Sequence, residues 1–180
     1  MNNQWIYKNT EDNAARFLLG ERGAKTLICI GINASTATPE HLDNTLATVK
    51  RFSRDLGYDS WLMLNVYPQR ATNPKLLHRI MDKELHRKNL EYIDWAFHTG
   101  RSDIWGAWGT LINKREYLFI CLKDIYELSK RYNLNWFHMG PLCKSGHPHH
   151  PLYLKKNLLL EKFDMNQYMM VLNIHKSKEK

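Results

Sequence analysis

The sequence predicts an α/β fold: a single domain, 1–180, with a doubly wound sheet of about four parallel strands flanked by helices. Apolar runs, typical of buried strands, alternate with amphipathic stretches, typical of helices. A strand, a helix and a second strand are expected within about forty residues, which is the pattern of a βαβ unit with a right-handed crossover. The 180 residues suit one domain of ordinary size. We place the core at about 25–154 and expect 155–180 to form a C-terminal extension with a frayed basic end.

The first βαβ unit is the clearest part of this pattern. Residues 27–33 form a nearly unbroken apolar run, which is typical of a strand covered on both faces. The Thr-Pro-Glu sequence at 38–40 supplies an N-cap, a proline and an early acid, so we expect a helix to begin there. Gly57 is placed to end that helix, and residues 61–66 then predict the second parallel strand.

The alternation continues through the second half of the chain. The expected elements, in order, are a helix marked by residues 90–97 that stops near Gly100, a strand over 103–109 that runs into a glycine turn, a helix over 117–132 and a strand over 134–139. Residues 168–172 are candidates for an added edge strand.

Composition limits the classes of partner. The 26 Lys and Arg outnumber the 18 Asp and Glu, and the resulting formal charge of +8 favours anionic partners such as nucleic acid or nucleotides. No run approaches the roughly 20 apolar residues of a membrane span, and no secretory signal is visible, so we expect no membrane partner and a cytoplasmic location. Cys29, Cys121 and Cys143 form no CxxC pair, which argues against a disulfide framework or a zinc ribbon, and we expect Cys29 and Cys121 in the core.

The candidate site lies where the parallel strands end, because ligands of open parallel sheets bind beyond the carboxyl ends of the strands. The segments that follow the four expected strands are 33–36, 65–72, 108–110 and 144–153. All are rich in polar, glycine or proline residues, and the second and fourth are longer than simple connectors need to be. We therefore expect function to reside in these loops.

Two of these loops carry candidate anion ligands. Ser35 and Thr36, with the backbone amides near Thr38, form a possible anion-binding set, whereas the alternative is an ordinary tight turn. Arg70 follows a strand, where a guanidinium can bind a phosphate through two hydrogen bonds; the alternative is a surface salt bridge.

The fourth loop holds a cluster of histidines. Cys143, His147, His149 and His150 are conceivable zinc ligands, but no second CxxC or HxxxH pair supports a metal, and we expect neither metal nor cofactor. The sequence instead favours one histidine as a neutral hydrogen-bond donor or proton carrier in a loop that prolines make rigid.

A basic stretch lies between 75 and 88. It contains Lys75, His78, Arg79, Lys83, His86, Arg87 and Lys88, diluted by two acids. Such a run is usually a solvated helix face, and the functional alternative is a contact surface for a phosphate backbone with salt-dependent binding.

The four loops carry motifs that occur together in a known family. These motifs are Gly-Ile-Asn-Ala-Ser-Thr-Ala at 31–37, Asn65 with Arg-Ala-Thr-Asn-Pro at 70–74, Ala-Trp-Gly at 107–109 and Lys-Ser-Gly-His-Pro-His-His-Pro-Leu-Tyr at 144–153. Over about 27–154 the chain therefore resembles the DUF1643 family of small bacterial and phage proteins. Members of that family usually have proline where this chain has Ala34, and the family brings no settled function.

More remotely, the loops are similar to those of the uracil-DNA glycosylase superfamily. That resemblance implies a glycosylase-like fold, in which Asn33 orients a water molecule, His150 and Pro151 form the His-Pro loop that stabilises the departing base, and Asn65 reads the base. A flipped base also needs an aromatic platform, for which Tyr67 and Trp108 are candidates. An amide cannot accept the proton of water, and neither Asp43 nor Asp59 is obviously placed to help.

The leading hypothesis is a protein that binds nucleotide or nucleic acid at the strand ends, with hydrolysis of an N-glycosidic bond by a DNA glycosylase-like reaction as its candidate activity. The expected catalytic residues are Asn33 and His150. The expected binding residues are Ser35, Thr36, Asn65, Tyr67, Arg70, Thr72, Trp108, Gly109, Lys144, His147, Pro151 and Tyr153. The alternative is a non-catalytic module, such as a phage or host-defence factor, that holds a nucleotide or a partner protein.

Overall fold

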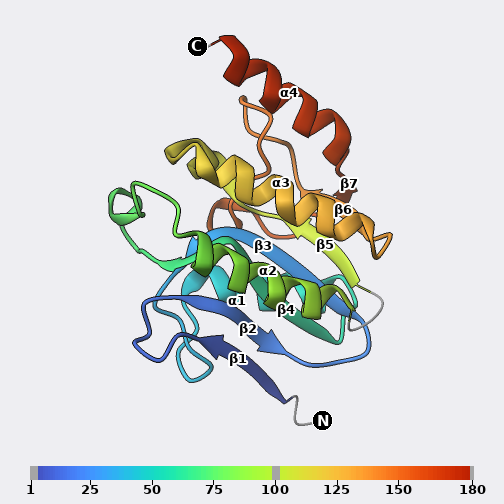
Figure 1. Ribbon diagram of the computed structural model, residues 1–180. Coiled ribbons are helices and arrows are strands. Elements are labelled where there is room, and N and C mark those ends of the chain that lie inside the picture. The colour runs from blue at the N-terminus through green and yellow to red at the C-terminus, as the bar shows by residue number, and fades with distance from the viewer. Residues whose placement is uncertain (1–3, 99–101, 179–180) are drawn as a thin grey trace.

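The computed structural model describes residues 4–98 and 102–178, and a mixed sheet of seven strands forms its centre (Figure 1). The strand order is β1-β2-β4-β3-β5-β6-β7. The four inner strands β4, β3, β5 and β6 run parallel, while β1, β2 and β7 pair antiparallel at the edges. The strands are β1 Trp5–Asn9, β2 Arg16–Glu21, β3 Thr26–Ala34, β4 Ser60–Arg70, β5 Ser102–Gly106, β6 Asn135–Met139 and β7 Leu160–Lys162. The α/β class is therefore confirmed, but the sheet is larger than expected and mixed.

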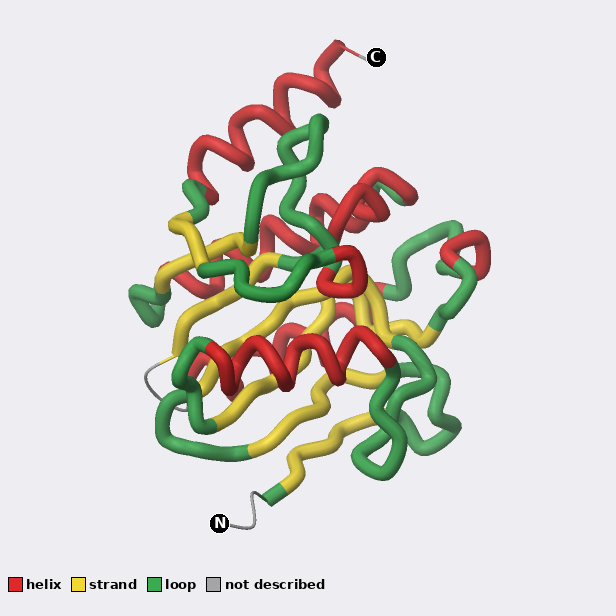
Figure 2. Tube along the Cα trace, turned by 180° about the vertical axis from the view of Figure 1, so that it is seen from behind, coloured by secondary structure: helices red, strands yellow, loops and turns green. Residues whose placement is uncertain are grey.

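Helices cover both faces of the sheet. They are α1 Asn44–Asp55, α2 Lys83–His98, α3 Tyr117–Lys130 and α4 Met165–Lys178, with short 3₁₀ turns η1 Pro74–Leu76, η2 Gly109–Lys114 and η3 Pro151–Tyr153. Seen from behind, α1 crosses in front of the strands, and α2 and α3 lie on the opposite face (Figure 2). Leu46, Val49 and Phe52 of α1 pack with Cys29 in one core cluster, while Cys121 of α3 belongs to the other. Cys29 and Cys121 are thus buried core residues, as expected.

The first helix starts later than the Thr-Pro-Glu sequence predicts. Thr38 and His41 instead close a turn through two backbone hydrogen bonds of 3.1 and 3.2 Å. Asp43 is the N-cap, and its side chain accepts a hydrogen bond from the Leu46 amide at 2.9 Å. The helix ends at Asp55 as expected, and Gly57 follows with a φ of +77°.

The second parallel strand is longer than expected. β4 continues to Arg70, because the Arg70 amide donates to the Ala14 carbonyl at 2.8 Å and β3 still pairs with β4 as far as Ala34. Asn65 and Tyr67 therefore lie inside the strand rather than in a loop after it.

The expected edge strand at residues 168–172 is wrong, since these residues lie in α4. Asp164 initiates that helix: its carboxylate accepts from the Gln167 amide at 2.9 Å and its carbonyl from the Tyr168 amide. The edge strand is the shorter β7. α4 extends to Lys178, and the expected helix stop at Gly100 falls outside the described residues.

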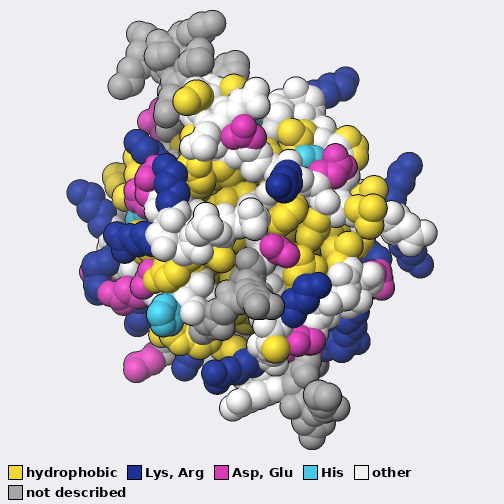
Figure 3. Space-filling model, turned by 90° about the vertical axis from the view of Figure 1, so that its right-hand side faces the viewer, with side chains coloured by type: hydrophobic (Ala, Val, Ile, Leu, Met, Phe, Trp, Pro, Cys, Tyr) yellow, Lys and Arg dark blue, Asp and Glu magenta, His cyan; other side chains and the backbone are white. Residues whose placement is uncertain are grey.

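The topology produces a switch point beside β3. The chain leaves β3 toward β4 on one side, and β5 then pairs with β3 on the other side. A crevice for ligands is expected where neighbouring parallel strands send their connections in opposite directions. Figure 3 shows the side of the molecule that lies on the right in Figure 1, and there basic, acidic and hydrophobic side chains are interspersed. Within the described ranges, no helix is long and apolar enough to span a bilayer.

Candidate functional site

Asp43 lies at the centre of the candidate site, although the sequence assigns it no role. As the N-cap of α1 it accepts from the Leu46 amide through Oδ1, while its Oδ2 accepts a hydrogen bond from the Ser35 hydroxyl. Ser35 directly follows β3, so this bond ties the end of the strand to the start of the helix. The local signal was an aspartate just before the first helical residue, which competes with the Thr-Pro-Glu sequence for the cap.

His150 is held as a neutral imidazole. It is the N-cap of η3, and its Nδ1 accepts a hydrogen bond from the Leu152 amide at 3.4 Å. Burial lowers the pKa of His150 below its ordinary value, and the nearby carboxylate of Asp43 opposes this effect. Because Nδ1 acts as the acceptor, the proton of the neutral ring resides on Nε2. The side chain can therefore donate a hydrogen bond to a ligand without carrying a charge.

Two arginines converge on the loop between β3 and α1. Arg70 donates to the Ser35 carbonyl and, at 2.7 Å, to the Tyr7 hydroxyl. Arg16, on β2, is 1% exposed and donates to the Ala37 carbonyl at 3.0 Å. Within the described part of the chain, the Nε atoms of both arginines are buried without a hydrogen-bond partner. The site therefore holds two guanidinium groups near the Asp43 carboxylate.

The charge of Arg16 persists at neutral pH despite its surroundings. Burial, and next the positive charge of Arg70, lower the pKa of Arg16 to about 10, while Asp43 raises it. The sequence does not indicate a role for Arg16, because this residue stands at the start of a mostly apolar run. Only the structure shows that the run is a strand buried along its whole length. Among the described residues Arg70 forms no salt bridge, and its guanidinium is not open for a phosphate because it bonds the backbone carbonyls of Ser35 and Ala37 and the Tyr7 hydroxyl.

Asparagines fasten the ends of β3 and β4. Asn33 donates through Nδ2 to the carbonyls of Ala34 at 3.0 Å and Ala71 at 2.7 Å. Asn65 is fully buried, and with its amide nitrogen directed at the Asn33 carbonyl it donates at 3.1 Å. Asn89 of α2 supports the same strand by donating to the Asn65 carbonyl at 3.0 Å. A base-reading role for Asn65 does not fit this burial.

The expected aromatic platforms are core residues. Tyr67 and Trp108 are both fully buried, with the Tyr67 hydroxyl on His78 Nδ1 at 2.8 Å and the Trp108 indole nitrogen on the Tyr168 hydroxyl at 2.9 Å. Neither ring can stack on a ligand in this arrangement. Tyr153 is instead 75% exposed, and its ring centroid lies 6.0 Å from that of His150. It is the aromatic side chain that the site offers to solvent.

Gly109 sets the position of His150. Its amide donates to the Pro148 carbonyl at 3.0 Å, which joins the end of β5 to the histidine loop. Its φ is +63°, and a Cβ at this position would lie 3.4 Å from the Cβ of His150. Pro151 is buried at the start of η3, so the His-Pro pair is fixed from both sides.

The remaining predicted residues are divided between exposed loop positions and the core. Thr36 and Thr72 are exposed in the loops after β3 and β4. His147 is buried, with Nδ1 on the Tyr168 hydroxyl at 2.8 Å and Nε2 on Asn113 at 3.1 Å. With Lys144 it lines a cavity of about 970 Å³ beside α4. His149 contacts the Cys143 sulfur at 3.5 Å, and among residues 4–98 and 102–178 no three His, Cys, Asp or Glu side chains gather to hold a metal ion.

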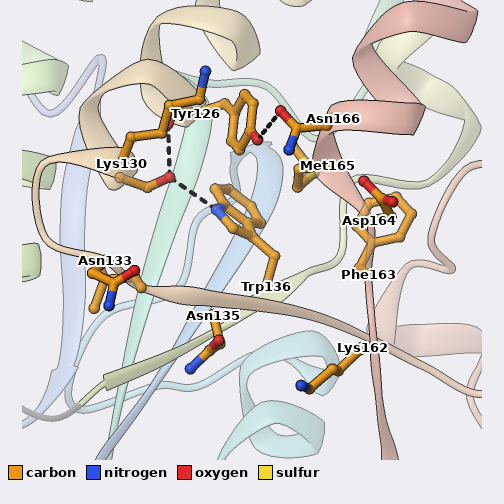
Figure 4. A pocket seen from close by; sticks show the side chains of 12 residues that line it. Tyr126, Lys130, Asn133, Asn135, Trp136, Lys162, Phe163, Asp164, Met165 and Asn166 are labelled. Carbon is orange, nitrogen blue, oxygen red and sulfur yellow. Dashed lines mark hydrogen bonds between the residues drawn. The ribbon is translucent and has the colours of Figure 1, made fainter.

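A separate cavity of about 570 Å³ lies between the end of α3 and the start of α4 (Figure 4). The Tyr126 hydroxyl donates to Asn166 at 2.6 Å, and the Trp136 indole nitrogen donates to the Ser129 hydroxyl at 2.9 Å. Trp136 lies near the amino end of β6, away from the carboxyl edge of the sheet, beyond which Asp43 and His150 lie. We therefore treat this cavity as distinct from the candidate site.

Comparison with known proteins places the chain in a family. The family described as "Protein of unknown function (DUF1643)" matches residues 16–152, a range that contains Arg16, Asp43, Arg70 and His150. Comparisons with curated proteins and with solved structures found no match. Because the match covers most of the chain and all the strand ends that form the site, the chain belongs to the DUF1643 family.

Proposed function

We propose that the carboxyl edge of the sheet binds nucleotide or nucleic acid, and that its candidate activity is the hydrolysis of an N-glycosidic bond in a uracil-DNA-glycosylase-like fold. The observation that carries the proposal is the nearness of two groups at this edge: a neutral His150, whose Nδ1 accepts from the Leu152 amide, and the Asp43 carboxylate, whose charge acts on the His150 ring. The neighbouring Arg16 and Arg70 give this edge an excess of positive charge, which suits a phosphate-bearing ligand.

His150 acts on the departing base. When the bond between C1′ and the base nitrogen breaks, the electron pair moves onto the base, which leaves as an anion. A hydrogen bond from His150 Nε2 stabilises that charge, and a donor already fixed in place is effective because it needs no reorganisation. Tyr153, exposed beside His150, supplies the stacking surface for the base.

Water attacks from the side of β3. The Asn33 Nδ2 is fixed by two carbonyls, so its Oδ1 is left to orient a water molecule. The water oxygen bonds to C1′, and its proton passes to the Asp43 carboxylate, which provides the proton acceptor that an amide cannot be. Asp43 is positioned for this by Ser35 and by the first turn of α1.

The test uses oligonucleotides that contain uracil, a mismatched base or a modified base. Alkali breaks the strand at abasic sites, so a product band reports glycosylase action. We expect product with the wild type and its loss in His150→Gln, with His149→Gln as the matched control because His149 contacts Cys143 instead. Absence of both product and salt-sensitive binding in the wild type would refute the proposal.

A non-catalytic binding module is the second candidate. The observation that favours it is the side chain at position 33, where an amide tied to backbone carbonyls takes the place of a carboxylate. A pure binding protein would bind the oligonucleotide without forming product. In that case Asp43→Asn should change the dissociation constant by no more than about twofold, since the amide keeps the N-cap acceptor.

A further inference from the structure

Four basic side chains form a pocket of their own at the carboxyl edge. Lys75, Arg79, Lys114 and Arg115, the basic pocket, line a hollow of about 400 Å³. Lys75 and Arg79 come from the segment after β4, and Lys114 and Arg115 from the end of η2 after β5. No acidic residue lines the hollow, and none of the ion pairs formed by residues 4–98 and 102–178 includes any of the four.

Arg115 builds the pocket rather than filling it. It donates to the carbonyls of His78 at 3.0 Å, Leu77 at 3.0 Å and Lys75 at 3.3 Å, and so fixes the curve of the segment. The Asn73 side chain accepts from the Lys75 amide at 3.0 Å and holds the start of η1. The cations are therefore carried by a backbone with a defined shape, and Lys75, Arg79 and Lys114 remain exposed.

The basic stretch at 75–88 divides into two parts in the structure. In α2, Arg87 pairs with Glu84 and Glu91, and His86 bonds Asp124 of α3 at 2.9 Å. That part is a charge-balanced helix face of the usual kind. Lys75 and Arg79 lack such acidic partners and join two cations that follow them by more than thirty residues in the chain. Only this first part has the character of an anion-binding surface.

Apolar side chains stand beside these cations. Leu76 is 66% exposed and Ile80 is 85% exposed, and both belong to the segment that projects from the left of the sheet in Figure 1. Apolar side chains next to basic ones suit a polymer whose phosphates alternate with apolar base faces. A free nucleotide would not need a second set of cations outside the Asp43–His150 site.

We propose that the basic pocket, with Leu76 and Ile80, contacts the phosphate backbone of a nucleic-acid strand, so that the ligand of this edge is a polymer rather than a free nucleotide. The inference rests on the proposed function, because it assigns the strand's reactive nucleotide to the Asp43–His150 site. A hydrogen bond links the Asp43–His150 site to the basic pocket: the Asn33 side chain, at the end of β3, donates to the Ala71 carbonyl, where the segment that leads to Lys75 begins.

The test measures binding against salt concentration. A fluorescein-labelled single strand of roughly 20 nucleotides is titrated by anisotropy at several NaCl concentrations. The proteins are the wild type, the variant K75E/R79E/K114E, and the control K25E/K123E/K162E, which makes the same change of charge at three exposed lysines away from the pocket. Arg115 is kept because it holds the segment, and circular dichroism verifies that each variant is folded.

We expect K75E/R79E/K114E to weaken binding at least tenfold at low salt and to flatten the slope of log K against log[NaCl] by about 2, since each lost phosphate contact contributes about 0.7 for a single strand. The control should keep the wild-type slope. Deoxyuridine 5′-monophosphate, used as competitor, should bind both variants alike.

Each other result overturns the inference in a recognisable way. An unchanged slope in K75E/R79E/K114E, with binding still sensitive to His150→Gln, would refute the basic pocket and leave the proposed function standing. No binding of either probe by the wild type would refute both proposals. Pocket-dependent binding to vesicles that contain phosphatidylserine, without binding of the oligonucleotide, would show that the surface recognises lipid instead.

Discussion

The Ser35 hydroxyl donates a hydrogen bond to the Asp43 carboxylate, and this contact joins the first residue after β3 to the N-cap of α1. It fixes a carboxylate at the switch point of the sheet, where ligands of open parallel sheets bind. Asp43 also lies close enough to His150 and Arg16 to shift the pKa of each. Helix capping and site electrostatics thus depend on one side chain, and substitutions can separate the two roles.

Two replacements at Asp43 distinguish capping from chemistry. Asp43→Ala removes the acceptor for the Leu46 amide, so we expect the free energy of unfolding to fall by about 1 kcal/mol. Asp43→Asn keeps the cap acceptor and should therefore destabilise the fold less than Asp43→Ala, yet lose at least 100-fold of any glycosylase rate because an amide accepts no proton. Urea unfolding and the strand-cleavage assay measure the two quantities. Equal losses of rate and stability in both variants would contradict the assigned role.

Stability should respond to pH through His150. Its folded pKa is lower than its unfolded pKa of 6.5, so the unfolded chain binds the proton more readily. The contribution to stability is therefore complete above about 6.5 and is lost as the pH falls through the folded pKa. We expect the imidazole signal of His150 to titrate below 6.5 by NMR, and His150→Gln to unfold with a shallower loss of stability on the acid side. A His150 signal that titrates above 6.5 would contradict this.

Tyr168 supports two buried groups with one hydroxyl. Trp108 Nε1 donates to it at 2.9 Å, and His147 Nδ1 bonds it at 2.8 Å. Tyr168→Phe leaves both nitrogens buried without this partner, so we expect a loss of about 1–3 kcal/mol in the free energy of unfolding. Tyr153→Phe, at an exposed position, is the control and should change stability by less than about 0.5 kcal/mol. Equal stability of the two variants would show that His147 is not held in this way.

Substitution of two glycines with positive φ distinguishes backbone strain from a change in the position of His150. Gly109→Ala and Gly146→Ala both force a side chain into the left-handed region, at a cost of about 1–2 kcal/mol each. At Gly109 the new Cβ also meets His150 at 3.4 Å, whereas at Gly146 nothing lies within 4 Å. We expect similar thermal destabilisation, with oligonucleotide binding reduced in Gly109→Ala alone. Equal binding by the two variants would argue against His150 as a ligand contact.

The sequence predicts the inner strands and the edge at which the site forms, because both depend on local patterns. Unbroken apolar runs mark buried parallel strands, and their polar ends mark the switch-point loops. The antiparallel strands were missed or misplaced for a physical reason. β2 begins and ends with the charged residues Arg16 and Glu21, so its sequence does not indicate that both are buried. Residues 168–172 were expected to form a strand because the sequence offers a single capping signal, Asp164, for the helix α4.

Burial decided most of the differences at the site. Asn65, Tyr67 and Trp108 are polar or aromatic residues in or beside the motifs, and sequence alone does not indicate that the core encloses them. It also does not indicate that β4 continues past Asn65 and Tyr67. Arg16 entered the site through pairing of β2 with β4, a contact between distant segments that local patterns do not reveal. Asp43 was visible in sequence, but its role depended on where the helix begins.

The central claim is that a nucleic-acid strand binds at the carboxyl edge of the parallel strands, and amide chemical-shift mapping tests it most directly. Titration of the isotope-labelled protein with the oligonucleotide should shift the amide signals of Ser35, Asp43, Gly109 and Leu152 together with those of Lys75 and Lys114. Signals of Asn135 and Asn166, which line the distinct cavity beside α3, should stay unchanged. Shifts confined to that cavity, or no shifts at all at saturating oligonucleotide, would contradict the account.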